Sequence, residues 1–330
     1  MDIVADPRGG AAGRSRAGRL LSLVIPMHNE AAVIGILFDR LAEVIPTLRI
    51  SCEVICIDDG SRDATLALLR ERALSDPRIR VLPLARNFGK EAALAAGLDV
   101  CRGDVIVPLD ADLQDPPELI AEFLDQWERG YDVVYGVRGD RSSDSFGKRI
   151  TARLFYRVFN ALSDYPIPED TGDFRLMDRS VNEALKRLEE RNRFNKGLFA
   201  WVGFKQVGVP YVRPERAGGT TSWQTPALWK LAIDGITSFS TAPLRVWSAV
   251  GMWAALLAFL AGVALIVRVV LLGRDVPGYA SLMVVLLFCF SVQMVAFGVM
   301  GEYLGRMYME VKRRPVYITQ GDDGTGSNGP

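Results

Sequence analysis

The chain has 330 residues, which is enough for one domain of catalytic size with an accessory part. Basic and acidic residues are balanced at 39 each, which argues against a nucleic-acid binder, and the single histidine, His28, argues against a His-centred triad or a multi-His metal site. A hydrophobic fraction of 49% beside 24% charged residues indicates a chain that is partly soluble and partly embedded in a membrane.

The two ends of the chain have compositions that cannot build a core. Residues 1–18 are rich in Gly, Ala and Arg and lack the apolar segment of a secretory signal, so we expect a disordered basic tail. Between the ends we expect a catalytic domain over 19–225, an interfacial helix and linker over 226–245, and two membrane spans within 246–302. Residues 303–330 are then a cytoplasmic tail.

From Leu20 onward, short apolar runs alternate with stretches of helical spacing, and each apolar run ends in polar turn residues. This alternation predicts an α/β domain with a mostly parallel sheet and helices on both faces. The predicted strands lie within 20–30, 52–61, 80–85 and 104–115, and the predicted helices within 30–46, 63–74 and 90–101.

Polar side chains gather where each predicted strand ends. In a parallel sheet the carboxyl ends of the strands meet at one edge, and ligands bind there. We therefore expect a single crevice lined by residues from four strand ends. No GxGxxG follows the first strand and the chain has no P-loop motif, which argues against a dinucleotide-binding fold and a P-loop NTPase. The residues expected to line the crevice are His28, Asn29, Glu30, Asp58, Asp59, Arg86, Asn87, Asp110 and Asp112.

Two acidic pairs at the strand ends offer different chemistry. Asp110 and Asp112 are spaced i, i+2 on an extended segment, so their carboxylates can converge on Mg²⁺ or Mn²⁺ while substrate phosphates complete the shell. Solvated acidic turns are common, but this pair ends an apolar strand and is followed by Gln114. Asp58 and Asp59 could bind a nucleoside or cap the next helix, and these two roles are compatible.

Two uncharged stretches, 247–267 and 281–301, have the length that a helix needs to cross a bilayer. Their connector, GRDVPG, is too short for a domain, so we expect a hairpin; the alternative is a pair of buried helices in a soluble core. Basic residues flank the outer ends, which places the catalytic domain and both termini in the cytoplasm, at the inner (plasma) membrane. The stretches 151–162 and 226–239 are predicted to be interfacial helices, with ordinary amphipathic core helices as the alternative.

The sequence resembles one enzyme family over almost its whole length, from about residue 21 to 317. The matching segments are VIPMHNE, CIDDGSRDAT, ARNFGKEAALAAGLD, PLDADLQDPPE, TGDFRLMDR, NKGLFAWVGF, ITSFSTAPLR and GEYLGRMYMEVKRRP. They are similar to segments of family 2 glycosyltransferases with the GT-A fold, specifically the polyprenyl-phosphate glycosyltransferases. That group includes dolichol-phosphate mannose synthases and bactoprenol glucosyltransferases, and the two-span hairpin favours the latter.

The resemblance implies a metal-dependent, membrane-anchored, inverting hexosyltransferase. It would move a hexose from a UDP-sugar to undecaprenyl or decaprenyl phosphate for cell-envelope glycan modification. Glucose is the first candidate for this hexose. The implied partners are the nucleotide sugar, the lipid phosphate and the membrane, with no nucleic acid, and a homo-oligomer is left open. Carried over from the family's motifs, the donor site would comprise Pro26, Asn29, Glu30, Asp58, Asp59, Asn87 and Lys90. Asp110, Asp112 and Gln114 would bind Mg²⁺ or Mn²⁺, and Arg138, Arg213 and Arg216 would bind the acceptor phosphate. The implied catalytic residues are Asp112 and Asp173.

One departure from the family pattern concerns the acceptor phosphate. Where relatives have a Gly-x-Ser/Thr-Lys run, this chain has Ser222 in place of the lysine. Arg213 or Arg216 would therefore carry more of that contact. His28 stands where many relatives have Tyr or Phe, and we interpret it as a loop-packing or base-contacting residue.

Several roles and functions stay open from the sequence alone. Asp173 is expected to orient the sugar or the acceptor, with general base as a second role and a turn residue at a helix start as the alternative. Arg175 could pair with a phosphate or with Asp173. A GDP-mannose-dependent mannosyltransferase is the nearest alternative function, and a non-catalytic membrane scaffold is the second. A processive polymerase is disfavoured because the chain has no QxxRW motif and no third span.

Overall fold

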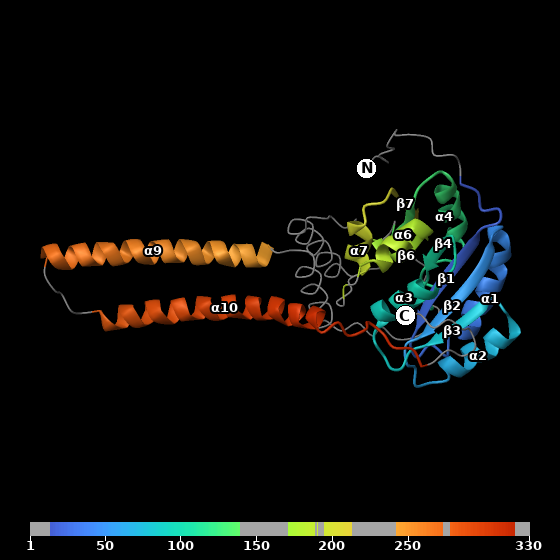
Figure 1. Ribbon diagram of the computed structural model, residues 1–330, viewed down its shortest axis with the longest axis horizontal. Helices are drawn as coiled ribbons and strands as arrows, with labels where there is room; N and C mark the ends of the chain where they lie inside the picture. Colours follow the sequence, from blue (N-terminus) through green and yellow to red (C-terminus); the bar gives the residue numbers. More distant parts are fainter. Residues whose placement is uncertain are drawn as a thin grey trace.

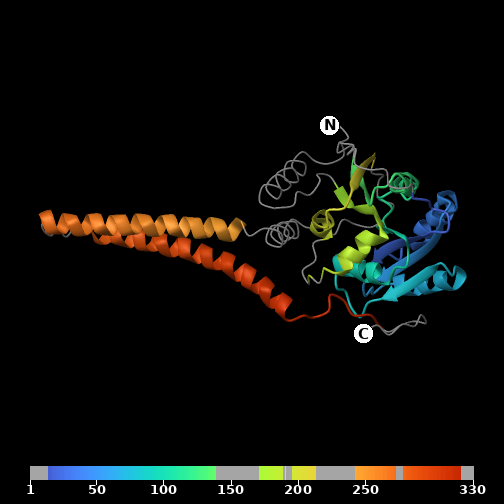
Figure 2. The same ribbon diagram turned by 45° about the horizontal axis from the view of Figure 1, so that its top comes forward.

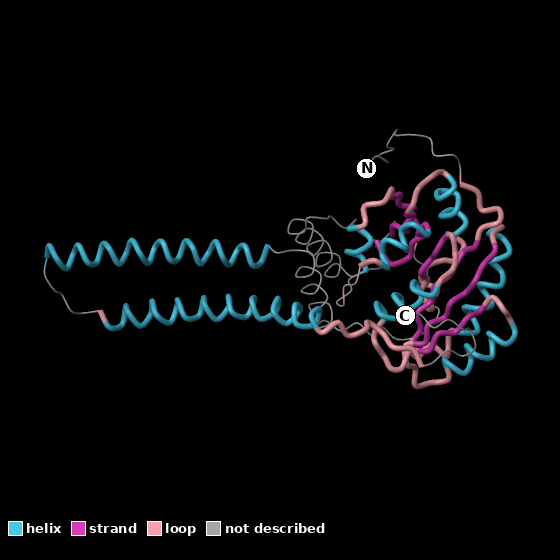
Figure 3. Tube along the Cα trace, in the orientation of Figure 1, coloured by secondary structure: helices cyan, strands magenta, loops and turns pink. Residues whose placement is uncertain are grey.

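An α/β domain and a pair of long helices that extend from it make up the computed structural model (Figures 1 and 3). The structure describes residues 14–138, 171–188, 190, 195–212, 242–272 and 278–320. The strands are β1 (Leu20–Met27), β2 (Ser51–Asp58), β3 (Ile79–Pro83), β4 (Val105–Pro108), β5 (Val133–Arg138), β6 (Thr171–Asp178) and β7 (Gln206–Tyr211). The helices are α1 (Ile34–Val44), the 3-10 helix η1 (Ile45–Leu48), α2 (Thr65–Ser75), α3 (Lys90–Val100), α4 (Leu119–Glu128), α6 (Arg179–Lys186), α7 (Asn195–Trp201), α9 (Ala242–Leu272) and α10 (Tyr279–Val311).

The seven strands form one sheet in the order β3-β2-β1-β4-β6-β5-β7. β1 pairs in parallel with β2 and β4, and β2 pairs in parallel with β3. β6 lies antiparallel between β4 and β5, and β7 is parallel to β5. Among the described strands only β6 runs against the others, so the predicted mostly parallel α/β sheet is confirmed. The reversal brings the first residues of β6 to the edge at which β1, β2 and β4 end.

Helices cover both faces of the sheet because consecutive strand residues point to opposite sides. In β1, Leu23 and Ile25 belong to a core shared with α1 and α4, whereas Val24 belongs to a second core shared with α3, α6 and α7. β2 and β4 alternate between the two cores in the same way. Strands buried on both faces read as continuous apolar runs, which is the pattern seen in the sequence.

Helix α3 lies close to the sheet because it contains Gly97. A Cβ at this position would lie 2.3 Å from Val24 Cγ1 and 2.6 Å from Ile57 Cδ1. A larger residue would push α3 away from β1 and β2. The close approach fixes the position of Lys90, the first residue of α3, at the carboxyl edge of the sheet.

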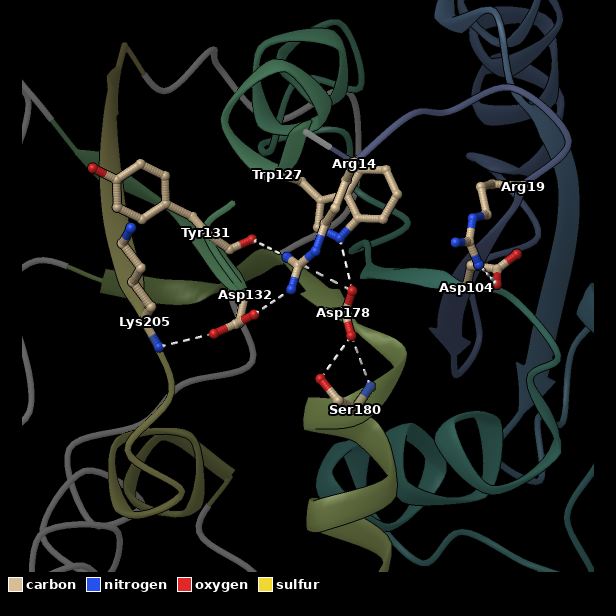
Figure 4. A network of polar contacts seen from close by, with 9 residues as sticks. All are labelled: Arg14, Arg19, Asp104, Trp127, Tyr131, Asp132, Asp178, Ser180 and Lys205. Carbon is tan, nitrogen blue, oxygen red and sulfur yellow. Dashed lines mark hydrogen bonds and ion pairs between the residues drawn. The ribbon is translucent and has the colours of Figure 1, made fainter. Parts of the chain in front are cut away.

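Polar contacts attach the segment before β1 to the domain (Figure 4). Arg14 falls within the tail predicted to be disordered; its guanidinium donates to Asp132 Oδ1 at 2.6 Å and lies 5.6 Å from the centroid of the Trp127 ring. Asp178 accepts hydrogen bonds at 2.9 Å from both Trp127 Nε1 and the Ser180 N–H, and thereby caps α6. This network joins the N-terminal segment to α4, β6 and the start of α6.

The helices α9 and α10 lie side by side and extend away from the α/β domain (Figures 1 and 2). Both are long and apolar enough to cross a membrane, over Val246–Ala264 and Ser281–Val311. Their large side chains are exposed; Phe259 and Phe288, for example, are each 68% exposed. Such exposure is unfavourable in water and expected in lipid, so two helices buried in a soluble core do not describe this pair.

Some predicted segments lie outside the described residues. They are the two interfacial helices predicted over 151–162 and 226–239, the connector of the hairpin over 273–277, and the chain ends 1–13 and 321–330. The interfacial helices therefore stay predictions.

Candidate active site

The loops that follow β1 and β2 are bound to each other at the carboxyl edge of the sheet. The Asn29 N–H donates to Ser61 Oγ at 2.9 Å, and Asn29 Oδ1 accepts from the Arg62 N–H at 2.8 Å. The Glu30 N–H donates to Thr65 Oγ1 at 2.8 Å. Asn29 has a positive φ of 56°, which asparagine adopts more readily than most residues. The structure thus brings Asn29 and Glu30 beside the loop after β2.

Asp58 and Asp59 are buried at the end of β2. Asp59 accepts hydrogen bonds from the N–H groups of Phe88 (2.7 Å) and Gly89 (2.9 Å), directly before α3. Burial raises the pKa of Asp59, and these two hydrogen bonds oppose the rise. Asp58 Oδ2 accepts from the Ser61 N–H at 3.3 Å, whereas Asp58 Oδ1 is buried without a hydrogen-bond partner in the described part of the chain. Neither carboxylate caps α2, whose first N–H, that of Thr65, donates instead to Asp63 Oδ1 at 3.0 Å.

The loop between β3 and α3, residues 84–89, packs onto the loop after β2. Gly60 permits this contact: its φ is 64°, and a Cβ there would lie 2.6 Å from the backbone nitrogen of Asn87. The Asn87 side chain is exposed at this edge. His28 Nδ1 lies 2.9 Å from the carbonyl oxygen of Asp59, which agrees with a loop-packing role. Both loops are therefore held in one arrangement by backbone contacts.

Lys90 binds two predicted site carboxylates at once. Its Nζ lies 2.7 and 2.8 Å from the two oxygens of Asp110 and 3.1 Å from Asp173 Oδ2. Desolvation opposes the charge on Lys90, but attraction by Asp173 and Asp110 outweighs it and raises the pKa of Lys90 above its ordinary value. The ammonium group is therefore charged at neutral pH and joins the loop after β4 to β6.

Asp112 and Gln114 share with Asp110 the loop that follows β4. Asp112 Oδ1 accepts from the Gln114 N–H at 3.1 Å, and the Asp110 side chain is 29% exposed. The described residues contain no group of three or more His, Cys, Asp or Glu side chains that could hold a metal ion. Two carboxylates and an amide oxygen nevertheless fit Mg²⁺, which commonly binds one or two carboxylates together with substrate phosphates.

Asp115 anchors the same loop to β7. Its buried carboxylate accepts a hydrogen bond from the Tyr211 hydroxyl at 2.7 Å. The Tyr211 ring packs edge-on against Phe174, with centroids 6.1 Å apart, and a Cβ on Gly136 would lie 2.8 Å from it. No local sequence pattern predicts this pair, because 96 positions separate the two residues. The bond joins the predicted metal loop to the strand that leads toward Arg213.

Arg175 and Asp173 both lie in β6, ahead of α6, so Asp173 is not a residue at a helix start. Arg175 is 4% exposed; its Nη2 donates to the Gly172 carbonyl at 2.9 Å, and its guanidinium lies 3.9 Å from the Phe199 ring centroid. Desolvation lowers the pKa of Arg175 to about 10, although the charge of Asp173 works in the opposite direction. Of the two roles that the sequence left open, this burial favours electrostatic support of Asp173 over contact with a phosphate.

The remaining predicted residues are placed less completely. Pro26 is partly buried in β1. Arg138 ends β5, in register with Tyr211 of β7. Arg213 and Arg216 lie outside the described residues. The structure thus gathers the predicted donor and metal residues at one edge and leaves the predicted acceptor arginines untested.

A mostly parallel sheet with acidic pairs at the ends of β2 and β4 defines an enzyme of the GT-A glycosyltransferase fold. The sequence model of the family described as Glycosyl transferase family 2 matches residues 22–186. The chain belongs to this family, and it is a glycosyltransferase.

Relatives match far beyond the catalytic domain. An uncharacterized glycosyltransferase of Synechocystis sp. is 51% identical over 298 residues, covering 90% of this chain and 94% of the relative. A prophage bactoprenol glucosyl transferase homolog of Escherichia coli K12 is 47% identical, covering 90% and 97%, and the bactoprenol glucosyl transferase of Shigella phage SfII is 46% identical, covering 90% and 96%. Among solved structures, mannosyl-3-phosphoglycerate synthase from Rubrobacter xylanophilus is 19% identical, with a TM-score of 0.47 over 72% of this chain and 76% of its own.

Proposed function

We propose that this enzyme transfers glucose from UDP-glucose to undecaprenyl or decaprenyl phosphate and releases UDP, as a step in cell-envelope glycan modification. The observation that carries the proposal is the ion-paired group of Asp110, Lys90 and Asp173, which sets a predicted metal ligand and a predicted sugar-facing carboxylate around one ammonium group. The names of the bactoprenol glucosyl transferases, matched over nearly their whole lengths, support the sugar and the lipid class. Two apolar helices next to the domain support a lipid acceptor.

The buried end of β2 supports binding of the nucleoside. Asp58 Oδ1 is an acceptor without a partner among the described residues, and uracil carries an N–H group that can donate to it. A buried acceptor that is satisfied only by its ligand discriminates strongly against bases without a matching donor. Asp59 already accepts two backbone hydrogen bonds, so it shapes the pocket while Asp58 contacts the base.

The donor diphosphate belongs at the loop after β4. Asp110, Asp112 and Gln114 would hold Mg²⁺ or Mn²⁺ there, and a bound cation would stabilise the charge that develops on the departing UDP. Lys90 adds a positive charge at the same place and stays protonated, because its pKa is raised. Lys90 and a cation held by the carboxylates would together supply positive charge where the leaving group becomes anionic.

The acceptor phosphate needs little activation. The second pKa of a phosphate monoester is about 6, so the lipid phosphate is largely dianionic at pH 7. One of its oxygens attacks the anomeric carbon while the bond from that carbon to the UDP oxygen breaks, and UDP departs with the electron pair. A single in-line displacement inverts the anomeric centre and gives a β-linked product from an α-linked donor. Asp173, which Lys90 binds at 3.1 Å, would orient a sugar hydroxyl.

We place the α/β domain in the cytoplasm, on the inner (plasma) membrane. The 31 residues of α9 and the 33 of α10 amount to about 46 and 50 Å of helix, more than the ~30 Å of hydrocarbon in a bilayer. Lys312, Arg313 and Arg314 follow α10 directly, which agrees with a cytoplasmic end for that helix.

Cysteine labelling tests this topology. In a variant with Cys289 replaced by Ala, a cysteine at Asp275 in the connector is expected to react with a membrane-impermeant maleimide added to intact cells. A cysteine introduced at Ser327 should react only after the membrane is permeabilised. Labelling of the C-terminal position from outside would overturn the arrangement.

Arg216→Ala is expected to raise the KM for lipid phosphate by about tenfold or more, the scale of one lost hydrogen bond to a charged group. The KM for the nucleotide sugar, and donor binding measured without lipid, should change by less than about twofold. Arg187→Ala, which removes an exposed arginine at the end of α6, is the control. Equal losses toward both substrates would show that the acceptor phosphate binds elsewhere.

The proposed function is tested with the full-length protein in bilayers that contain undecaprenyl phosphate. Radiolabelled UDP-glucose, other UDP-hexoses and GDP-mannose are supplied separately with Mg²⁺ or Mn²⁺. UDP-glucose is expected to give the most rapid labelling of lipid, with a β-linked product. Transfer from GDP-mannose alone would replace the proposal with a mannosyltransferase. If the protein neither transfers the sugar nor hydrolyses the donor with any of these nucleotide sugars, a non-catalytic scaffold is favoured.

A further inference from the structure

After α10 the chain returns to the α/β domain and pairs with the sheet at β3 (Figures 1 and 2). The Ala85 N–H donates to the Ile318 carbonyl at 2.7 Å, and the Gln320 N–H donates to the Pro83 carbonyl at 2.9 Å. An antiparallel bridge lies between these two hydrogen bonds. Because β3 is the last strand on that side of the sheet, the returning segment covers an edge that would otherwise expose unpaired backbone groups.

Tyr317 attaches the same segment to α3. Its hydroxyl donates to Asp99 Oδ2 at 2.9 Å. Its ring is partly buried against the core cluster on which Leu82 and Phe88 also pack. The segment therefore contacts the end of β3 and the side of α3, the two elements that border the loop of residues 84–89.

This loop supplies backbone donors to the active site. Phe88 and Gly89 donate their N–H groups to Asp59 at 2.7 and 2.9 Å. Lys90 follows directly and binds Asp110. A shift of the loop would therefore move the donors to Asp59 and the cation at Asp110 together.

The connection from the membrane helix to this edge is short. α10 ends at Val311 and Ile318 is already paired with the domain, so six residues, 312–317, span the distance. Val311 and Ile318 are seven residue steps apart, so a fully extended connection reaches at most about 25 Å. The edge of the sheet beside the active-site loop is thus held within a fixed distance of the end of a membrane helix.

We propose that residues 315–320 form a strap that positions the β3–α3 loop for sugar transfer, with Tyr317 as its anchor. The strap holds the loop from the membrane side and so keeps Lys90 and the donors to Asp59 in place while the domain lies at the bilayer. Tyr317 is a positioning residue, because it acts through Asp99 and α3. The inference rests on the proposed function for one part only, namely that the reaction served by the loop is sugar transfer.

Two truncations of the full-length protein in nanodiscs separate the strap from the rest of the tail. A chain ending after Gly321 keeps the strap, and one ending after Arg314 lacks it. Loss of the strap is expected to speed amide hydrogen exchange over residues 85–90 by about tenfold, whereas the chain that ends after Gly321 should exchange like the full-length protein. This readout needs no substrate, so it stands even if the proposed function fails. Unchanged exchange without the strap would overturn the proposal.

Tyr317→Phe removes one hydroxyl and keeps the ring, so the fold is preserved. Its kcat/KM for the nucleotide sugar is expected to fall by about three- to tenfold, the scale of one hydrogen bond, with the KM for lipid phosphate unchanged. Tyr308→Phe, at an exposed tyrosine of α10, is the matched control. A lower Tm with normal kinetics would mean that the strap only adds stability and would overturn its positioning role. Absence of transfer by the wild-type protein would count against the proposed function alone.

Discussion

Lys90→Met is expected to lower sugar transfer by about 10²–10³, the scale of one preorganised electrostatic contact. The substitution keeps the aliphatic stem and removes the ammonium that lies 2.7 Å from Asp110 and 3.1 Å from Asp173. The two carboxylates would then repel each other and the incoming diphosphate more strongly, because the ammonium that binds both of them would be gone. Steady-state kinetics with the nucleotide sugar, at saturating lipid phosphate, measure the loss.

Two further variants sharpen this expectation. Lys90→Arg keeps the charge with a different geometry and should retain more activity than the methionine variant. Lys186→Met removes a lysine that lies 3.5 Å from Glu183 on α6, and should leave transfer unchanged. The pKa of Lys90 is raised, so its ammonium group is fully protonated below about pH 10, the ordinary lysine value, and loses its charge only above its own raised pKa. Activity of Lys90→Met within about threefold of wild type would contradict this role.

The sequence predicts those parts of the fold that local pattern determines. The apolar run that becomes β1 and the acidic turn after β2 are both visible without a structure. α1, however, begins at Ile34 and not at residue 30. Residues 31–33 form a turn in which the Val33 N–H donates to the Glu30 carbonyl at 3.0 Å, while the Glu30 and Ala31 N–H groups donate to Thr65 and Asp63 at and before the start of α2. Long-range contacts of this kind leave no local signal.

The same limit applies to the site. The four strand ends predict that Asp58 and Asp110 share one edge, and the structure places them there. The sequence gives no sign that β6 is inserted antiparallel next to β4, so it could not show Asp173 beside Asp110 with Lys90 between them. Nucleoside binding and capping of the next helix were the two roles expected of Asp59; the structure shows a third, because Asp59 binds the N–H groups before α3 through a tertiary contact.

Asp112→Asn is expected to lower kcat by about 10²–10³ and to weaken Mn²⁺ binding while the fold is preserved. Asparagine keeps an oxygen that can accept from the Gln114 N–H, as Asp112 Oδ1 does at 3.1 Å, so the turn after β4 can persist. What is lost is one of two carboxylate charges at a site for a hard cation, and with it part of the stabilisation of departing UDP. Titration of Mn²⁺ by electron paramagnetic resonance, with UDP present, reports cation affinity independently of turnover.

The control for Asp112→Asn is a carboxylate at the start of α4. Glu118 is 44% exposed and pairs with Arg40 at 2.6 Å, away from the ion-paired group at the strand ends. Glu118→Gln removes the same unit of charge from nearly the same stretch of sequence, and both Mn²⁺ affinity and kcat should stay at wild-type values. If Asp112→Asn turns over like wild type at saturating Mn²⁺, Asp112 is not a metal ligand. Asp110 would then be the only carboxylate left of the two assigned to the cation, and its pairing with Lys90 would make lysine, rather than a metal ion, the principal positive charge at the diphosphate.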